Sequence, residues 1–126
     1  MAPTIQYLRY ATTVIATIFI GFGINSFVNP SLAISFFGLP YPDPEPLRQI
    51  TNVLLAAEGI RDVFIGLAMY ASYFGDNRVL GWITVAAGAT AGADGVICKM
   101  MVGTGEWNHW GYAPILVAIG GALALG

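Results

Sequence analysis

Residues 50–74 read ITNVLLAAEGIRDVFIGLAMYASYF, an apolar stretch with three charged side chains, Glu58, Arg61 and Asp62, near its middle. As a helix with a rise of about 1.5 Å per residue, this stretch is long enough to cross a hydrocarbon core of about 30 Å. One charge at the centre of such a helix costs about 2.5–3.5 kcal/mol, so three would cost roughly 8–10 kcal/mol. A segment with only a structural role is not expected to carry that cost, so function is sought first at residues 58–62.

The composition of the whole chain indicates an integral membrane protein. Of its 126 residues, 56% are hydrophobic and only 10% are charged, whereas soluble domains carry about 25% charged residues. The formal net charge is −2 and the five basic residues are scattered, which gives no basic patch for nucleic acid. The single cysteine excludes an intrachain disulfide.

Four apolar segments are visible, at about residues 7–28, 50–74, 79–102 and 110–126. They predict an all-α fold, a four-transmembrane-helix bundle that forms a single domain over residues 1–126. The fourth segment is the shortest. A proline-rich loop, LPYPDPEP at residues 39–46, separates the first two helices and is expected to be extended. The protein is therefore expected to be a multi-pass integral membrane protein, located in the endoplasmic reticulum if the cell is eukaryotic.

The depth of each residue in the membrane, counted along the helices, predicts that charged side chains of the second and third apolar segments lie close together. Segments 50–74 and 79–102 are joined by a tight turn and run antiparallel, so depth can be counted from that turn. Asp94 then lies level with Glu58 and within about one helical turn of Asp62. Glu58, Arg61 and Asp62 are spaced i, i+3, i+4 and share one face of their helix.

Three further polar residues are candidates for the site: two fall on the side of the membrane toward which the charged residues lie, and one lies on the proline-rich loop. Asn25 ends the first helix, His109 precedes the fourth, and Tyr41 lies on the proline-rich loop. These three residues are predicted to bind substrate. No metal site is expected, because one histidine and one cysteine give no zinc-ligand spacing, and no cofactor is implied.

The charged cluster has a structural interpretation and a functional one. A structural ion-pair network would need only one carboxylate for Arg61. Three carboxylates exceed that need, and the excess negative charge favours keeping one carboxyl protonated. A neutral carboxyl beside an ionised one is what acid–base chemistry uses.

The chain resembles a group of small four-helix integral membrane proteins of bacteria and fungi. The matching features are its length, EGIRD at residues 58–62, ADG at residues 93–95 and WNH at residues 107–109. Some members of this group look like epoxide hydrolases of fungal polyketide pathways, which open polyene epoxides. The resemblance implies that Arg61, Asp62 and Asp94 act like the Asp–Arg–Asp set of limonene-type epoxide hydrolases, which have a different fold, with Glu58 as a further acid or orienting group.

The expected function is therefore a membrane enzyme that opens an epoxide of a lipophilic polyketide or terpenoid. Asp94 is assigned as base, Asp62 as acid and Arg61 as the orienting group. One alternative is a proton-coupled carrier or channel that works as a homo-oligomer, because intramembrane carboxylates occur in proton relays. The other is a non-catalytic membrane scaffold whose charges pair with a partner helix.

Overall fold

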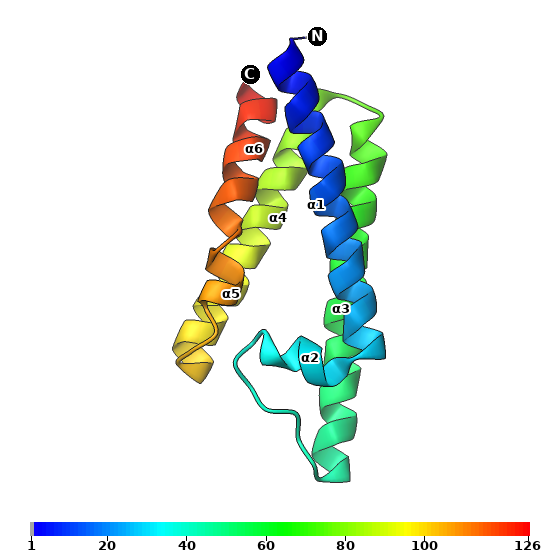
Figure 1. Cartoon of the computed structure of the whole chain (residues 1–126), viewed down its shortest axis with the longest axis vertical. Helices are drawn as coiled ribbons and strands as arrows, with labels where there is room; N and C mark the ends of the chain where they lie inside the picture. Colours follow the sequence, from blue (N-terminus) through cyan, green and yellow to red (C-terminus); the bar gives the residue numbers. More distant parts are fainter. Residues whose placement is uncertain (1) are drawn as a thin grey trace.

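The structure, a computed structural model, describes residues 2–126, and within that range it contains only helices and their connections. The predicted all-α fold is therefore confirmed. Figure 1 shows the elements in chain order. They are α1 (Pro3–Val28), α2 (Pro30–Ser35), α3 (Glu45–Tyr73), α4 (Asn77–Ile97), the π-helical turn η1 (Cys98–Val102), α5 (Trp107–Trp110) and α6 (Ala113–Leu125).

Two helices begin earlier than the apolar pattern predicted, because a proline lies in the first turn of each. α1 begins at Pro3 rather than near residue 7, and α3 begins at Glu45, with Pro46 next, rather than near residue 50. Proline is tolerated there because the first backbone N–H groups of a helix have no intrahelical partner. The last two residues of the predicted loop 39–46 therefore belong to α3.

The segment predicted as one helix over residues 110–126 is broken in the structure. α5 ends at Trp110 and α6 begins at Ala113. Pro114 lies in the first turn of α6 and has no N–H to bond the carbonyl of Trp110, so a continuous helix would lose that bond. The 13 residues of α6 span about 20 Å, less than a hydrocarbon core of about 30 Å.

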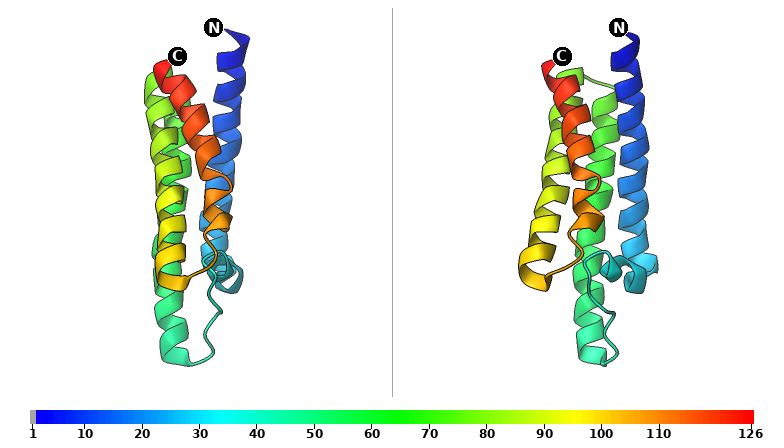
Figure 2. Two further views of the ribbon diagram at one scale, coloured as in Figure 1. Left: turned by 90° about the vertical axis from the view of Figure 1, so that its left-hand side faces the viewer. Right: turned by 60° about the vertical axis from the view of Figure 1, so that its left-hand side comes forward.

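The helices form two closely packed pairs, α1 with α3 and α4 with α6 (Figures 1 and 2). A Cβ atom on Gly59 of α3 would stand 2.6 Å from the carbonyl oxygen of Gly23 on α1, and one on Gly81 of α4 would stand 2.6 Å from that of Gly120 on α6. Only glycine permits such approaches. The pairs lie together at the end that holds both chain termini and diverge toward the end that holds α2 (Figure 1).

Two of the helical segments are long and apolar enough to cross a membrane, α1 and the continuous segment α4–η1, with mean hydropathy 1.7 and 1.3 in their most apolar windows. Only 28% and 33% of those windows are buried inside the fold. Large hydrophobic side chains are instead exposed on the outside of these helices, for example Ile18 and Trp82. The structure thus supports membrane association by composition, while the complete set of four spans remains a prediction.

Candidate functional site

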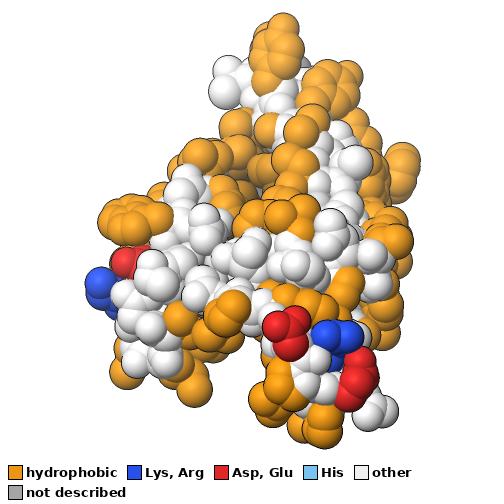
Figure 3. All heavy atoms as spheres, turned by 60° about the horizontal axis from the view of Figure 1, so that its bottom comes forward, with side chains coloured by type: hydrophobic (Ala, Val, Ile, Leu, Met, Phe, Trp, Pro, Cys, Tyr) orange, Lys and Arg blue, Asp and Glu red, His pale blue; other side chains and the backbone are white. Residues whose placement is uncertain are grey.

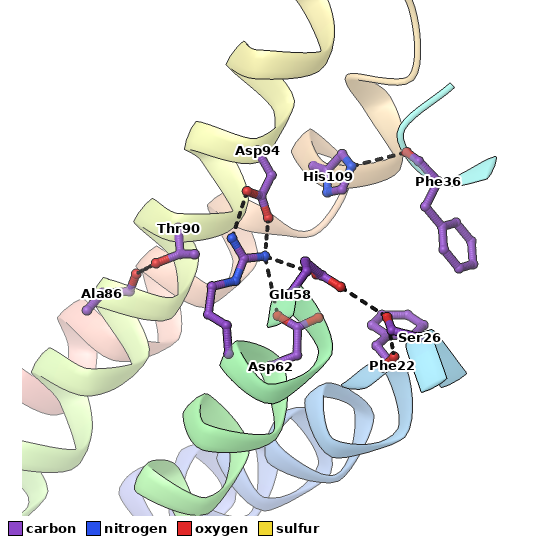
Figure 4. A network of polar contacts seen from close by, with 10 residues as sticks. Phe22, Ser26, Phe36, Glu58, Asp62, Ala86, Thr90, Asp94 and His109 are labelled. Carbon is purple, nitrogen blue, oxygen red and sulfur yellow. Dashed lines mark hydrogen bonds and ion pairs between the residues drawn. The ribbon is translucent and has the colours of Figure 1, made fainter. Parts of the chain in front are cut away.

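The charged residues predicted to meet lie around the guanidinium group of Arg61 (Figure 4). Arg61 donates two hydrogen bonds to Asp94, from Nη1 to Oδ1 at 3.1 Å and from Nη2 to Oδ2 at 2.7 Å. The same Nη2 lies 3.1 Å from Glu58 Oε1 and 3.4 Å from Asp62 Oδ1. Arg61 therefore holds one carboxylate by both oxygens and two others by single contacts, of which the contact with Asp62 is the longest.

The positions of these residues on their helices explain the geometry. Glu58 and Asp62 lie one helical turn apart on α3 and flank Arg61, so all three project from one face. Asp94 reaches the same level from α4, the antiparallel neighbour. Asp62 and Asp94 are buried, with 7% and 8% of their surface exposed, and this depth makes their charge balance important.

The first helix contributes a residue that the sequence analysis did not single out. Ser26 of α1 is buried and its hydroxyl donates to Glu58 Oε2 at 3.0 Å, while the other oxygen of Glu58 faces Arg61. The close approach of α1 to α3 at Gly59 brings this serine within reach. Glu58 is thereby fixed between two helices.

A cavity of ≈ 150 Å³ lies directly beside the cluster. Part of its wall is aromatic, formed by phenylalanines of α1 and of the α2 region. The residues that line it are Phe19, Phe22, Asn25, Ser26, Ala33, Phe36, Phe37, Glu58, Arg61, Asp62, Thr90, Ala91, Asp94, Asn108, His109 and Tyr112. The cavity thus combines a charged wall on α3 and α4 with a largely apolar one.

The α2 region and α5 are joined at one backbone carbonyl beside the cavity. The Phe36 oxygen accepts a hydrogen bond from Asn108 Nδ2 at 3.1 Å and lies 3.1 Å from His109 Nε2 (Figure 4). A carbonyl oxygen only accepts, so His109 Nε2 is the donor in this contact. His109 is 5% exposed, and its Nδ1 is buried without a hydrogen-bond partner in residues 2–126.

The three residues predicted to bind substrate are placed differently. Asn25 and His109 both line the cavity. Tyr41 does not: its hydroxyl donates to Asn52 Oδ1 at 2.7 Å, and the Arg48 guanidinium lies over its ring. Through this hydrogen bond the loop that carries Tyr41 contacts the first part of α3, which begins at Glu45. Tyr41 is therefore not part of the cavity wall, and its role in substrate binding stays a prediction.

The charged groups on the α2 end of the molecule form two separate patches on a largely uncharged surface (Figure 3). In one, Arg48 pairs with Glu45 at 3.0 Å. In the other, Lys99 pairs with Glu106 at 3.4 Å. A hydrogen bond from its own backbone, followed by the Lys99 ammonium, holds the pKa of Glu106 below its ordinary value, although burial opposes the shift.

Arg61 occupies the position among the carboxylates that a cation would otherwise take. Within residues 2–126 no group of three or more His, Cys, Asp or Glu side chains is arranged to hold a metal ion. The chemistry this arrangement can perform is proton transfer between carboxyl groups whose positions are fixed by one guanidinium.

A comparison with protein-family models matches residues 16–123 to the domain of unknown function DUF4267. The chain belongs to the DUF4267 family. The matched region includes Arg61, its three carboxylates and every residue that lines the cavity, so the site lies wholly inside the DUF4267 domain. Comparisons with curated proteins and with solved structures gave no match.

Proposed function

We propose that this protein is a four-helix membrane enzyme that opens the epoxide ring of a lipophilic small molecule, such as a polyketide or terpenoid, without a cofactor. The observation that carries the proposal is the Arg61 cluster: three carboxylates share one guanidinium beside a cavity with aromatic walls. A purely structural ion pair would need neither the additional carboxylates nor the cavity.

The exterior supports the membrane part of the proposal. Most of the apolar windows of α1 and α4–η1 face outward rather than into the core, which is unlike the core helix of a soluble protein. α3 is long enough for a third span, and of the charged residues near its middle Asp62 is buried while Glu58 and Arg61 are partly buried. α5 and α6 together would form the fourth span, with local thinning of the bilayer to match α6.

The charge balance supports a shared proton. With all three carboxyl groups ionised around one guanidinium, the cluster would carry an excess negative charge in a poorly solvated place. Both carboxyl oxygens of Asp94 accept a hydrogen bond from Arg61. Asp62 has one contact of 3.4 Å, so it is the better holder of the proton. The geometry therefore favours Asp62 as the acid.

Epoxide opening would then proceed in one balanced step. A water oxygen bonds to an epoxide carbon while the carbon–oxygen bond of the ring breaks. Asp94 accepts the proton of the water through its remaining lone pairs, and Asp62 gives its proton to the epoxide oxygen. Arg61 keeps both carboxyl groups aligned. If an internal hydroxyl replaces water, the same proton transfers yield a cyclic ether. The proton then returns from Asp94 to Asp62.

The cavity size limits what enters it. A cavity of ≈ 150 Å³ is about the size that holds one benzene molecule, so it can take an epoxide ring and its nearest carbons but not an extended polyene. The remaining chain of the substrate would lie outside the cavity. Asn25 and His109 line the cavity and are proposed to contact polar groups of the substrate.

The test is turnover of lipophilic epoxides by the purified protein in detergent, followed by chromatography of diols and cyclic ethers. Asp62→Asn and Asp94→Asn are each expected to lower kcat by about 100-fold or more, because general acid–base groups contribute about 10²–10⁴-fold. Asp43→Asn is the control, because Asp43 is fully exposed on the loop, and it should keep wild-type turnover. Full turnover by both Asp62→Asn and Asp94→Asn would refute the mechanism.

A further inference from the structure

We infer that Tyr112, which the sequence analysis did not select, is a catalytic residue whose hydroxyl donates a hydrogen bond to the epoxide oxygen as the ring opens. This inference rests on the proposed function and adds a residue to it. Three observations support the role: the place of Tyr112 on the cavity wall, the lack of a hydrogen-bond partner for its hydroxyl within residues 2–126, and the hydrogen bonds that most other donors of the cavity already make.

The break between α5 and α6 brings Tyr112 to the cavity. Tyr112 is the residue before α6, and its φ of −119° interrupts the helix. Its side chain lines the cavity that contains the Arg61 cluster. The ring packs against the hydrophobic core cluster that includes Phe19 and Leu116. Tyr112 therefore lies between the hydrophobic core and the cavity.

The hydroxyl of Tyr112 makes no hydrogen bond within residues 2–126, and the residue is half-buried on the wall of the cavity that Arg61 and its carboxylates also line. A phenol group has one proton to donate. A partly buried donor in a cavity is usually satisfied by water or by a ligand. The Tyr112 hydroxyl is thus available to a molecule that enters.

Most other donors along the cavity wall are already used. Arg61 Nη1 and Nη2 bond the carboxylates, and the Ser26 hydroxyl donates to Glu58. The Thr90 hydroxyl donates to the carbonyl of Ala86. The side chains of Asn108 and His109 both form hydrogen bonds with the Phe36 carbonyl oxygen. Arg61 Nε also has no partner within residues 2–126, but it is buried. The side-chain amide of Asn25, in the last turn of α1, is a further donor on the wall.

Ring opening creates the need for this donor. As the carbon–oxygen bond breaks, negative charge develops on the epoxide oxygen, which has two lone pairs. Asp62 supplies the proton that the oxygen keeps, and Tyr112 supplies a hydrogen bond and retains its own proton, so the atoms balance as in the step above. A preorganised donor of this kind acts mainly in the transition state.

The experiment compares Tyr112→Phe with Tyr70→Phe in the purified protein, using the same lipophilic epoxides. Each change removes one hydroxyl only. Tyr70 packs on the same core cluster, but its hydroxyl bonds Thr17 on α1, outside the cavity. Tyr112→Phe should lower kcat by about 100- to 1,000-fold with little change in KM or melting temperature. Tyr70→Phe should keep its kcat.

A second readout separates a catalytic role from a structural one. The loss in Tyr112→Phe should shrink for epoxides with electron-withdrawing substituents, because their developing alkoxide needs less stabilisation. A kcat within threefold of wild type on all epoxides would overturn the inference, as would a loss that appears in Asn25→Ala instead. If the wild-type protein opens no epoxide, the proposed function fails and the inference fails with it. If Asp62→Asn and Asp94→Asn are inactive but Tyr112→Phe is not, only the inference fails.

Discussion

Replacing Asp94 by Asn tests how strongly the two helix pairs are joined through Arg61. Asp94 accepts two charge-assisted hydrogen bonds, at 2.7 and 3.1 Å, and each such bond contributes about 1.5–3 kcal/mol. Asparagine keeps one acceptor oxygen, so about one bond is lost. Arg61 is 37% exposed and retains Glu58 and Asp62, so solvent screening and the remaining partners place the loss near the lower limit, about 1.5–2 kcal/mol.

A double-mutant cycle isolates this interaction. Arg61→Met should destabilise the protein by about 3 kcal/mol, since it leaves the carboxylates without their cation. In that background Asp94→Asn should change stability by less than about 0.5 kcal/mol or be slightly stabilising, because it removes a like charge. The expected coupling energy between Arg61 and Asp94 is therefore about 2 kcal/mol.

The assay is reversible denaturation in detergent micelles, followed by circular dichroism. Asp43→Asn serves as the surface control, because its oxygen lies 3.8 Å from Arg48 and its side chain is fully exposed; its effect should stay within about 0.5 kcal/mol. Additive effects of Arg61→Met and Asp94→Asn would refute the reasoning, because they would mean that the bidentate contact does not hold the helix pairs together.

Three further predictions concern the scaffold. Gly59→Ala should destabilise the protein by about 1–3 kcal/mol in the same assay, because its Cβ would stand 2.6 Å from an α1 carbonyl oxygen; Gly21→Ala meets nothing within 4 Å, and an equal loss there would contradict this explanation. Trp110→Phe removes the indole donor 3.1 Å from an α4 carbonyl and should cost about 0.5–1.5 kcal/mol; an unchanged melting temperature would argue against that bond. The pKa of Glu106 is lowered in the folded state, so its contribution to stability is present above its ordinary pKa of 4.5 and is lost as pH falls through the lower folded value. The difference in melting temperature between wild type and Glu106→Gln should therefore shrink from pH 7 to pH 3, and a difference that grows would contradict the lowered pKa of Glu106.

The approach of Asp94 to Arg61 could be predicted from the sequence because it depends on simple geometry. A tight turn sets the register of two antiparallel helices, and the rise per residue then gives the depth of every side chain. Asn25 and His109 were selected because they fall on the same side of the membrane as the charged residues, and both line the cavity. Tyr41 could not be placed in this way, because a loop has no fixed rise per residue.

The residues that were missed depend on packing between elements that are not joined by tight turns. Ser26 reaches Glu58 only because α1 lies against α3 at Gly59, and no short loop fixes the register of those two helices. The break before α6 did have a sequence signal in Pro114, which cannot continue the hydrogen bonds of a helix. The hydropathy pattern alone did not predict this break, and therefore it did not predict that Tyr112 lines the cavity.

The most direct test of the central claim uses proteoliposomes in which epoxide turnover and proton flux are measured together. The account predicts diol or cyclic ether that depends on Asp62 and Asp94, with no proton flux above that of empty vesicles. Proton flux that Glu58→Gln abolishes, without any product from the epoxide, would contradict the account and identify the Arg61 cluster as part of a proton pathway.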